Sequence, residues 1–178
     1  MKNVKLGIAP IGWTNDDCPD LGGEISFEQC VSEMSLAGYT GCEIGNKFPK
    51  DPQRLLNHLK PLNLQVVCAW FSTLFTDVNL DLDSHKEDFL RHIRFLKSVG
   101  AEYVDICECG NAIQQTELPV LDNKVVFNQK QWDKLFKGIE MFGQLANREG
   151  LKMVYHYHMG TGVQNMSEID MLMKHTNP

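Results

Sequence analysis

Short apolar runs alternate with longer amphipathic segments from one end of the chain to the other. Apolar runs of four to eight residues bounded by polar or glycine-rich stretches are typical of buried strands. The longer segments repeat their apolar residues at three- and four-residue spacing, which is typical of helices. We therefore expect strands at 4–10, 41–45, 65–71, 103–107 and 152–158.

Capping residues mark where the intervening helices begin. Ser, Asp and Asn accept hydrogen bonds from the free amides of a first helical turn, and glycine often follows a last turn. We expect Ser26 to begin a helix with Gln29 completing a capping box, and Gly38 to end it. The remaining helices are expected after Asp51, at 82–98, from Asn128 to Gly150, and from Ser167 to Met173.

The order of these elements indicates an α/β protein. Five strand-then-helix units without a hairpin signal predict a parallel sheet covered by helices. An open doubly wound sheet and a barrel both fit. The glycine-rich phosphate-binding turn of dinucleotide folds is missing after the first strand, where residues 10–13 read Pro-Ile-Gly-Trp. We favour a (β/α)8 TIM barrel, of which 178 residues would form the N-terminal part, because a whole barrel takes about 250 residues.

Charge and composition exclude several classes of protein. The formal net charge of −6 disfavours a protein that binds nucleic acid through its phosphates. No apolar stretch approaches the roughly 18 residues of a spanning helix, and the N-terminus lacks the apolar core of a signal peptide. The six cysteines are scattered, several within apolar runs, as expected of reduced thiols. We expect a cytoplasmic protein without a membrane or nucleic-acid partner.

Candidate site residues follow the predicted strands. In TIM barrels the reactive side chains lie at the carboxyl ends of the strands and in the loops beyond them. Polar groups next to tryptophan rings at these positions indicate a pocket for a sugar or polyol. The candidates are Trp13, Glu43, Asn46, Lys47, Trp70, Ser72, Glu108, His156 and His158.

Structural roles compete with these functional interpretations. Glu43 could pair with Lys47 purely for stability, and Trp13 and Trp70 could be ordinary packing residues. His156 and His158 share a face if the fifth strand continues through them, which favours a metal or acid–base site over two core histidines. The histidines on helices are expected to pack or to face solvent.

The same residues carry a resemblance to a known family. The chain resembles inosose dehydratases, which belong to the wider group of xylose isomerase-like TIM barrels, along essentially its whole length. The segments that carry the resemblance are 5–17, 21–30, 38–41, 43–49, 69–73 and 155–164.

The resemblance implies a lyase that removes water from 2-keto-myo-inositol (scyllo-inosose) and forms a trihydroxycyclohexane-dione. It implies a divalent metal, manganese or cobalt, with glutathione as a further cofactor, and a small cyclitol substrate. Aligning the fifth strand with the family places His156 as a metal ligand, although the family pattern usually has a carboxylate there. Glu43, Lys47, Glu108 and His158 are then expected in proton transfer or hydroxyl binding. Trp13, Asn46, Trp70 and Ser72 are expected to shape the pocket.

Two alternatives remain open at this stage. A sugar isomerase or epimerase uses the same barrel, and a half-barrel could bind a ligand or a partner, including a second copy, without turnover. A base-excision endonuclease of the same fold is disfavoured by the acidic charge. Because residues 1–178 would form part of a single barrel domain and the other metal ligands lie on later strands, we expect the 178-residue chain alone to be inactive.

Overall fold

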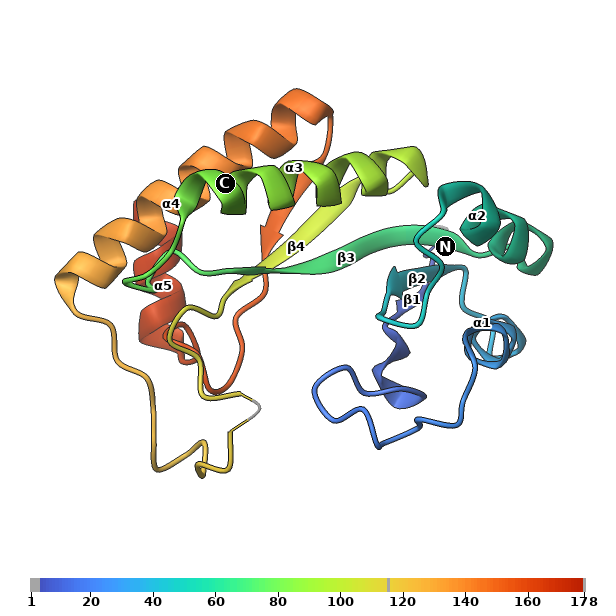
Figure 1. Cartoon of the computed structure of the whole chain (residues 1–178), viewed down its shortest axis with the longest axis horizontal. Coiled ribbons are helices and arrows are strands. Elements are labelled where there is room, and N and C mark those ends of the chain that lie inside the picture. Colours follow the sequence, from blue (N-terminus) through green and yellow to red (C-terminus); the bar gives the residue numbers. More distant parts are fainter. Residues whose placement is uncertain (1–3, 115, 178) are drawn as a thin grey trace.

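The computed structural model describes residues 4–114 and 116–177. In this part of the chain the strands form one parallel sheet in the order β1-β2-β3-β4-β5 (Figure 1). Each strand therefore lies beside its predecessor, as in a barrel, whereas a doubly wound sheet reverses its strand order. The strands are β1 (Gly7–Ile8), β2 (Gly41–Ile44), β3 (Gln65–Thr73), β4 (Tyr103–Glu108) and β5 (Lys152–Tyr155).

Helices connect the strands and pack on one another outside the sheet. Figure 1 shows α3 and α4 side by side across one face of the sheet, where they are in contact. The α-helices are α1 (Phe27–Leu36), α2 (Pro52–Leu59), α3 (Leu82–Ser98), α4 (Gln129–Glu149) and α5 (Met166–His175), with short 3₁₀ helices η1 (Pro10–Gly12) and η2 (Lys60–Leu62). No helix in 4–114 or 116–177 is long and apolar enough to cross a membrane.

Local capping explains where most helices begin. Ser26, Asp51 and Asn128 each accept a hydrogen bond from the third backbone amide beyond them, as the sequence predicts. At Asn128 the side chain of Gln131 also accepts a bond from the Asn128 amide, which completes a capping box. Gly150 ends α4 in the left-handed conformation that a glycine adopts without strain.

Four local predictions are wrong in detail. Gln29 turns its amide to Glu33, so the capping box at Ser26 is only half formed. The first strand is confined to Gly7–Ile8 because Pro10 begins η1. The fifth strand ends at Tyr155, before both histidines. The last helix is capped by Asn165 rather than Ser167.

The hydrophobic core lies between the sheet and the helices. Phe89 of α3 stacks on Phe142 of α4 at 4.3 Å between ring centroids, and both rings are fully buried. Met34 of α1 and Leu55 of α2 are likewise fully buried near the N-terminal strands. Because the apolar side chains gather on this side, the opposite face of the sheet is left to polar residues.

Candidate functional site

A cavity of about 1150 Å³ lies along the sheet, and its lining includes Arg91, His92 and Phe95 of α3. Its size suits a small-molecule ligand. Each strand, or the loop that follows it, contributes residues to the lining, as the predicted barrel requires. Among its polar lining residues are Thr14, Asp16, Asp17, Glu43, Asn46, Lys50, Ser72, Arg91, His92, Cys109, Gln114, His156 and His158.

A β-bulge sets the position of Glu43. Cys42 pairs with Val66, but the next residue, Glu43, pairs with Cys68, so Val67 is an extra residue in β3. Bulges turn side chains toward a new face and are common beside active sites. Here the bulge places the Cys68 thiol, rather than an isopropyl group, next to the Glu43 carboxylate.

Glu43 carries the most strongly perturbed carboxyl group of the cavity lining. The side chain is half-buried, and burial raises its pKa to about 7, assisted by the negative charges of Asp105 and Asp16. A carboxyl group with this pKa is partly protonated at neutral pH, so it can either give or take a proton. Raised carboxyl pKa values in cavities are a mark of functional sites.

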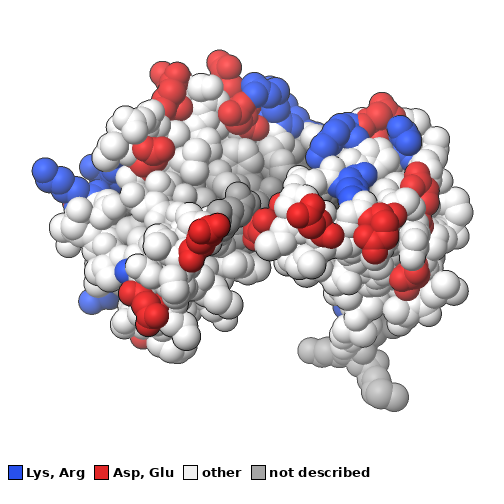
Figure 2. Space-filling view, turned by 60° about the horizontal axis from the view of Figure 1, so that its bottom comes forward, with Lys and Arg blue, Asp and Glu red and all other residues white. Residues whose placement is uncertain are grey.

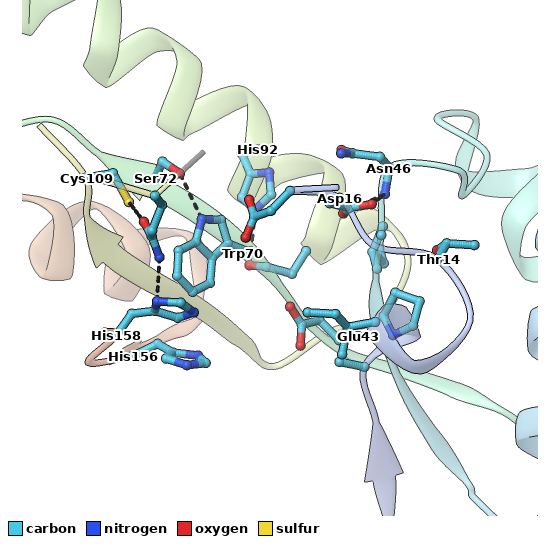
Figure 3. A pocket seen from close by; sticks show the side chains of 18 of the residues that line it. Thr14, Asp16, Glu43, Asn46, Trp70, Ser72, His92, Cys109, His156 and His158 are labelled. Carbon is cyan, nitrogen blue, oxygen red and sulfur yellow. Dashed lines mark hydrogen bonds between the residues drawn. The ribbon is translucent and has the colours of Figure 1, made fainter. Parts of the chain in front are cut away.

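Two imidazole rings and one indole ring lie together across the cavity from Glu43 (Figure 3). The centroid of Trp70 is 5.1 Å from that of His156 and 5.9 Å from that of His158. The Trp70 Nε1–H donates to the hydroxyl of Ser72 at 2.8 Å, which fixes the indole ring. His158 Nδ1 contacts the amide of Gln114 and lies 2.8 Å from the carbonyl oxygen of Met159.

The protonation of His156 depends mainly on burial. Burial lowers its pKa, the neighbouring His158 lowers it further, and the charge of Asp105 acts in the opposite direction. Its ring is therefore neutral at pH 7, which is the form that binds a metal ion or accepts a proton. Although β5 ends at Tyr155, the His156 amide still donates to the carbonyl oxygen of Ile106 of β4 at 2.8 Å. The chain therefore still runs beside β4 where it enters the site.

The loop after β1 closes one side of the cavity. The amide of Asn46 donates to the carboxylate of Asp16 at 3.1 Å, which ties this loop to the end of β2. Figure 2 shows acidic side chains beside the hollow, and Asp16, Asp17 and Glu43 belong to the cavity lining. The surroundings of the site are thus negatively charged on this side.

Three of the predicted site residues lie apart from the cavity lining. The ammonium of Lys47 donates to the carbonyl oxygens of Gly22, Gly23 and Ile25 at 2.7–2.9 Å, so all its protons are engaged by one loop. The Trp13 Nε1–H donates to Glu33 of α1 at 2.6 Å.

Glu108, the third of these residues, is almost fully buried at the end of β4. Its carboxylate accepts bonds from both the amide and the hydroxyl of Thr76, the hydroxyl of Thr73, and the amides of Phe75 and Gly110. Burial raises the Glu108 pKa, while these bonds lower it. With five donors directed at it, the carboxylate organises the β3–α3 turn.

Sequence reasoning missed Cys68, Asp105 and His92. Asp105 lies opposite Trp70 in the sheet register, on the cavity side, and is 5% exposed. Its signal in the sequence was a single carboxylate inside an apolar strand, because a carboxylate is seldom buried unless it is paired. His92 on α3 approaches the carbonyl oxygen of Ala69 at 3.4 Å and lines the cavity, so a packing role alone does not describe it.

The sequence is similar to curated proteins of one kind. No family model matches the chain. It is 51% identical over 98% of its length to an inosose dehydratase of Geobacillus thermodenitrificans, and 49% identical over 98% to one of Clostridium botulinum. The resemblance predicted from the sequence is thereby confirmed. The chain spans 58% of the length of each of these curated relatives.

Solved structures share the fold. The probable 3-DHS dehydratase AsbF of Bacillus anthracis aligns with a TM-score of 0.69 at 16% identity, over 97% of this chain and 59% of its own. A xylose isomerase-like TIM-barrel protein of Mycobacterium smegmatis, in complex with magnesium, aligns with a TM-score of 0.66 at 13% identity, over 97% of this chain and 61% of its own. At these identities the likeness shows the fold alone, which is that of part of a TIM barrel, as the sequence predicts.

Proposed function

We propose that the chain carries the N-terminal half of the active site of a hydro-lyase that removes water from 2-keto-myo-inositol. The observation that carries this proposal is the 51% identity to an inosose dehydratase over 98% of the chain. The match covers 176 residues, so it includes the cavity segments 43–49, 69–73 and 155–164.

Glu43 is the proposed proton-transfer residue. Dehydration beside a ketone needs a base for the proton on the α-carbon and an acid for the departing β-hydroxyl. The pKa of Glu43, near 7, suits either task at neutral pH. His158, held by Gln114 and by the carbonyl of Met159, is the proposed partner from the other side of the cavity. One group on each side allows proton removal and hydroxyl protonation on opposite faces of a ring.

Trp70 and Ser72 are proposed to bind the substrate. An indole face packs against the C–H face of a cyclitol, while hydroxyl and amide groups bind its hydroxyls. Ser72 and Asn46 offer such groups within the cavity lining. Trp13, Lys47 and Glu108 are proposed to act indirectly, because they hold the loops from which this lining comes.

His156 is the proposed ligand of the divalent metal that the family resemblance implies, with manganese or cobalt as the expected ion and glutathione as a further cofactor. The ring fits a ligand role because it is neutral at pH 7 and lines the cavity. A bound metal ion would polarise the ketone oxygen and stabilise negative charge on it.

A dehydratase assay on 2-keto-myo-inositol tests the proposal. The enzyme is a chimera in which this chain continues with the part of the Geobacillus relative that it does not match, with manganese or cobalt and with or without glutathione. We expect the chimera to form the dione. The rate of dione formation should fall by at least about 100-fold in Glu43→Gln. It should be unchanged in Glu102→Gln, a matched control at an exposed position. Formation of an isomeric ketose without water loss would replace the proposal with an isomerase or epimerase. No turnover of either kind would reject it.

A further inference from the structure

We infer that Glu43, Cys68 and Asp105 form a binding site for a thiophilic divalent cation of the zinc class. The site lies on the polar face of the sheet, opposite the hydrophobic core. The inference concerns a cation site on β2–β4 and does not rest on the dehydratase activity. It is distinct from the ligand role proposed for His156, and Glu43 can act in proton transfer only while this cation site is empty.

The three groups converge from three adjacent strands. One carboxylate oxygen of Glu43, the thiol of Cys68 and one carboxylate oxygen of Asp105 all lie within 4.8 Å of one another. Ligand atoms around tetrahedral zinc lie roughly 3.3–3.8 Å apart, given bonds of about 2.0–2.3 Å. Small side-chain rotations of Glu43 and Cys68, which are only half-buried, would close that difference.

Asp105 supplies an independent sign that something is bound here. Its side chain is 5% exposed, and its Oδ1 has no hydrogen-bond partner among the residues that the structure describes. A buried carboxylate oxygen without a partner is costly, and native proteins rarely leave one. A cation coordinated by this oxygen would remove the cost and would also offset the repulsion between Asp105 and Glu43.

The donor set indicates the class of cation. A thiolate with two carboxylates suits zinc or cobalt, whereas magnesium and calcium prefer oxygen ligands alone. The thiol of Cys68 contacts Asp105, and burial raises its pKa. Binding therefore exchanges the Cys68 proton, and any proton on Glu43, for the metal ion.

The site is accessible and leaves a coordination position open. Glu43 borders the large cavity, while Asp105 borders a second one of about 410 Å³ together with Val154 and His156. A cation held by three protein groups would therefore face space that water or a small ligand can fill. Zinc sites with three protein ligands keep such an open position for water or a small ligand.

Cobalt substitution tests the inference on the 178-residue chain itself. A thiolate bound to Co²⁺ gives a charge-transfer absorption in the near ultraviolet, and Zn²⁺ should abolish it by displacement. We expect each chain to bind one Co²⁺ ion and to show this absorption band. The band should vanish in Cys68→Ser and persist in Cys109→Ser, which removes a cavity thiol outside the cluster.

Affinity measurements extend the test to the carboxylates. In zinc competition with a chromophoric chelator, Asp105→Asn and Glu43→Gln should each weaken binding by at least about 100-fold, since loss of an outer-shell partner alone costs about 10–100-fold. Glu117→Gln, an exposed carboxylate in the loop after β4, should leave the affinity unchanged. Circular dichroism of each metal-free variant checks that it is folded. Absence of the band in the native chain, or its survival in Cys68→Ser, would overturn the inference.

Discussion

The carboxylates of Glu43 and Asp105 lie within 4.8 Å of each other although β3 separates the strands that carry them. Both side chains converge with the thiol of Cys68 on the strand between them, and the bulge at Val67 brings Cys68 into register with Glu43. Two negative charges this close in a half-buried place favour a proton or a cation between them. Burial is the main cause of the raised pKa of Glu43, the charge of Asp105 adds to it, and the same pair of carboxylates forms part of the proposed metal site.

The first prediction concerns the pH dependence of stability. The pKa of Glu43 is raised from about 4.3 in the unfolded chain to about 7 in the folded one. The folded state therefore binds more protons than the unfolded state between these pH values, and stability falls as pH rises from about 4.3 to 7. Metal-free Glu43→Gln should lose this dependence and should be more stable than the native chain at pH 8 by about 2 kcal/mol, after allowing for solvent screening.

Urea unfolding at pH 4, 6 and 8, in the presence of a chelator, measures this difference. Glu102→Gln is the matched control, because its side chain is exposed, and it should keep the native pH profile. A Glu43→Gln profile parallel to that of the native chain would show that Glu43 titrates normally.

The second prediction concerns the buried carboxylate of Glu108. Glu108→Gln keeps the shape but directs an NH₂ group at donors such as the amides of Thr76 and Gly110. We expect a loss of about 2–4 kcal/mol in the free energy of unfolding, because buried donors would lose their acceptor. Urea denaturation measures it, with Glu117→Gln as the exposed control. A change below about 0.5 kcal/mol would contradict the structural role assigned to Glu108.

The third prediction concerns the loop that Lys47 holds. Lys47→Met removes the donor to the carbonyls of Gly22, Gly23 and Ile25. We expect faster amide hydrogen exchange at 15–25 and a loss of about 1–2 kcal/mol in stability, since the side chain is partly solvated. Lys137→Met on the exposed side of α4 should change neither quantity. Unchanged exchange in Lys47→Met would mean that the loop is held by other contacts.

The fourth prediction compares two glycines in α4. A Cβ at Gly138 would lie 2.3 Å from the ring of Phe75, whereas one at Gly143 would lie 3.5 Å from its nearest neighbour, Met153. Gly138→Ala should destabilise the chain by about 1–3 kcal/mol through overpacking, despite the better helix propensity of alanine. Gly143→Ala should instead stabilise it by roughly 0.5–1 kcal/mol. Thermal unfolding of both variants measures the contrast, and equal effects would contradict the packing of Phe75 on Gly138.

The sequence by itself determined the order and approximate limits of the elements. Ser26, Asp51 and Asn128 begin helices because each bonds an amide three residues away, an interaction that the local sequence contains in full. The strand-then-helix order and the missing phosphate-binding turn also sufficed to favour a barrel. Where a nearby residue offered a competing interaction, as Asn165 did to Ser167, the local prediction was wrong.

Only the tertiary structure decided which polar residues face one another. Glu43, Lys47 and Glu108 had similar sequence signals, yet Glu43 lines the cavity while the other two bind backbone groups of neighbouring loops. Asp105 and Cys68 gave little signal because their importance depends on register between strands and on one extra residue in β3. Capping depends on contacts three or four residues apart, whereas the site depends on contacts between strands far apart in the chain, which sequence periodicity does not encode.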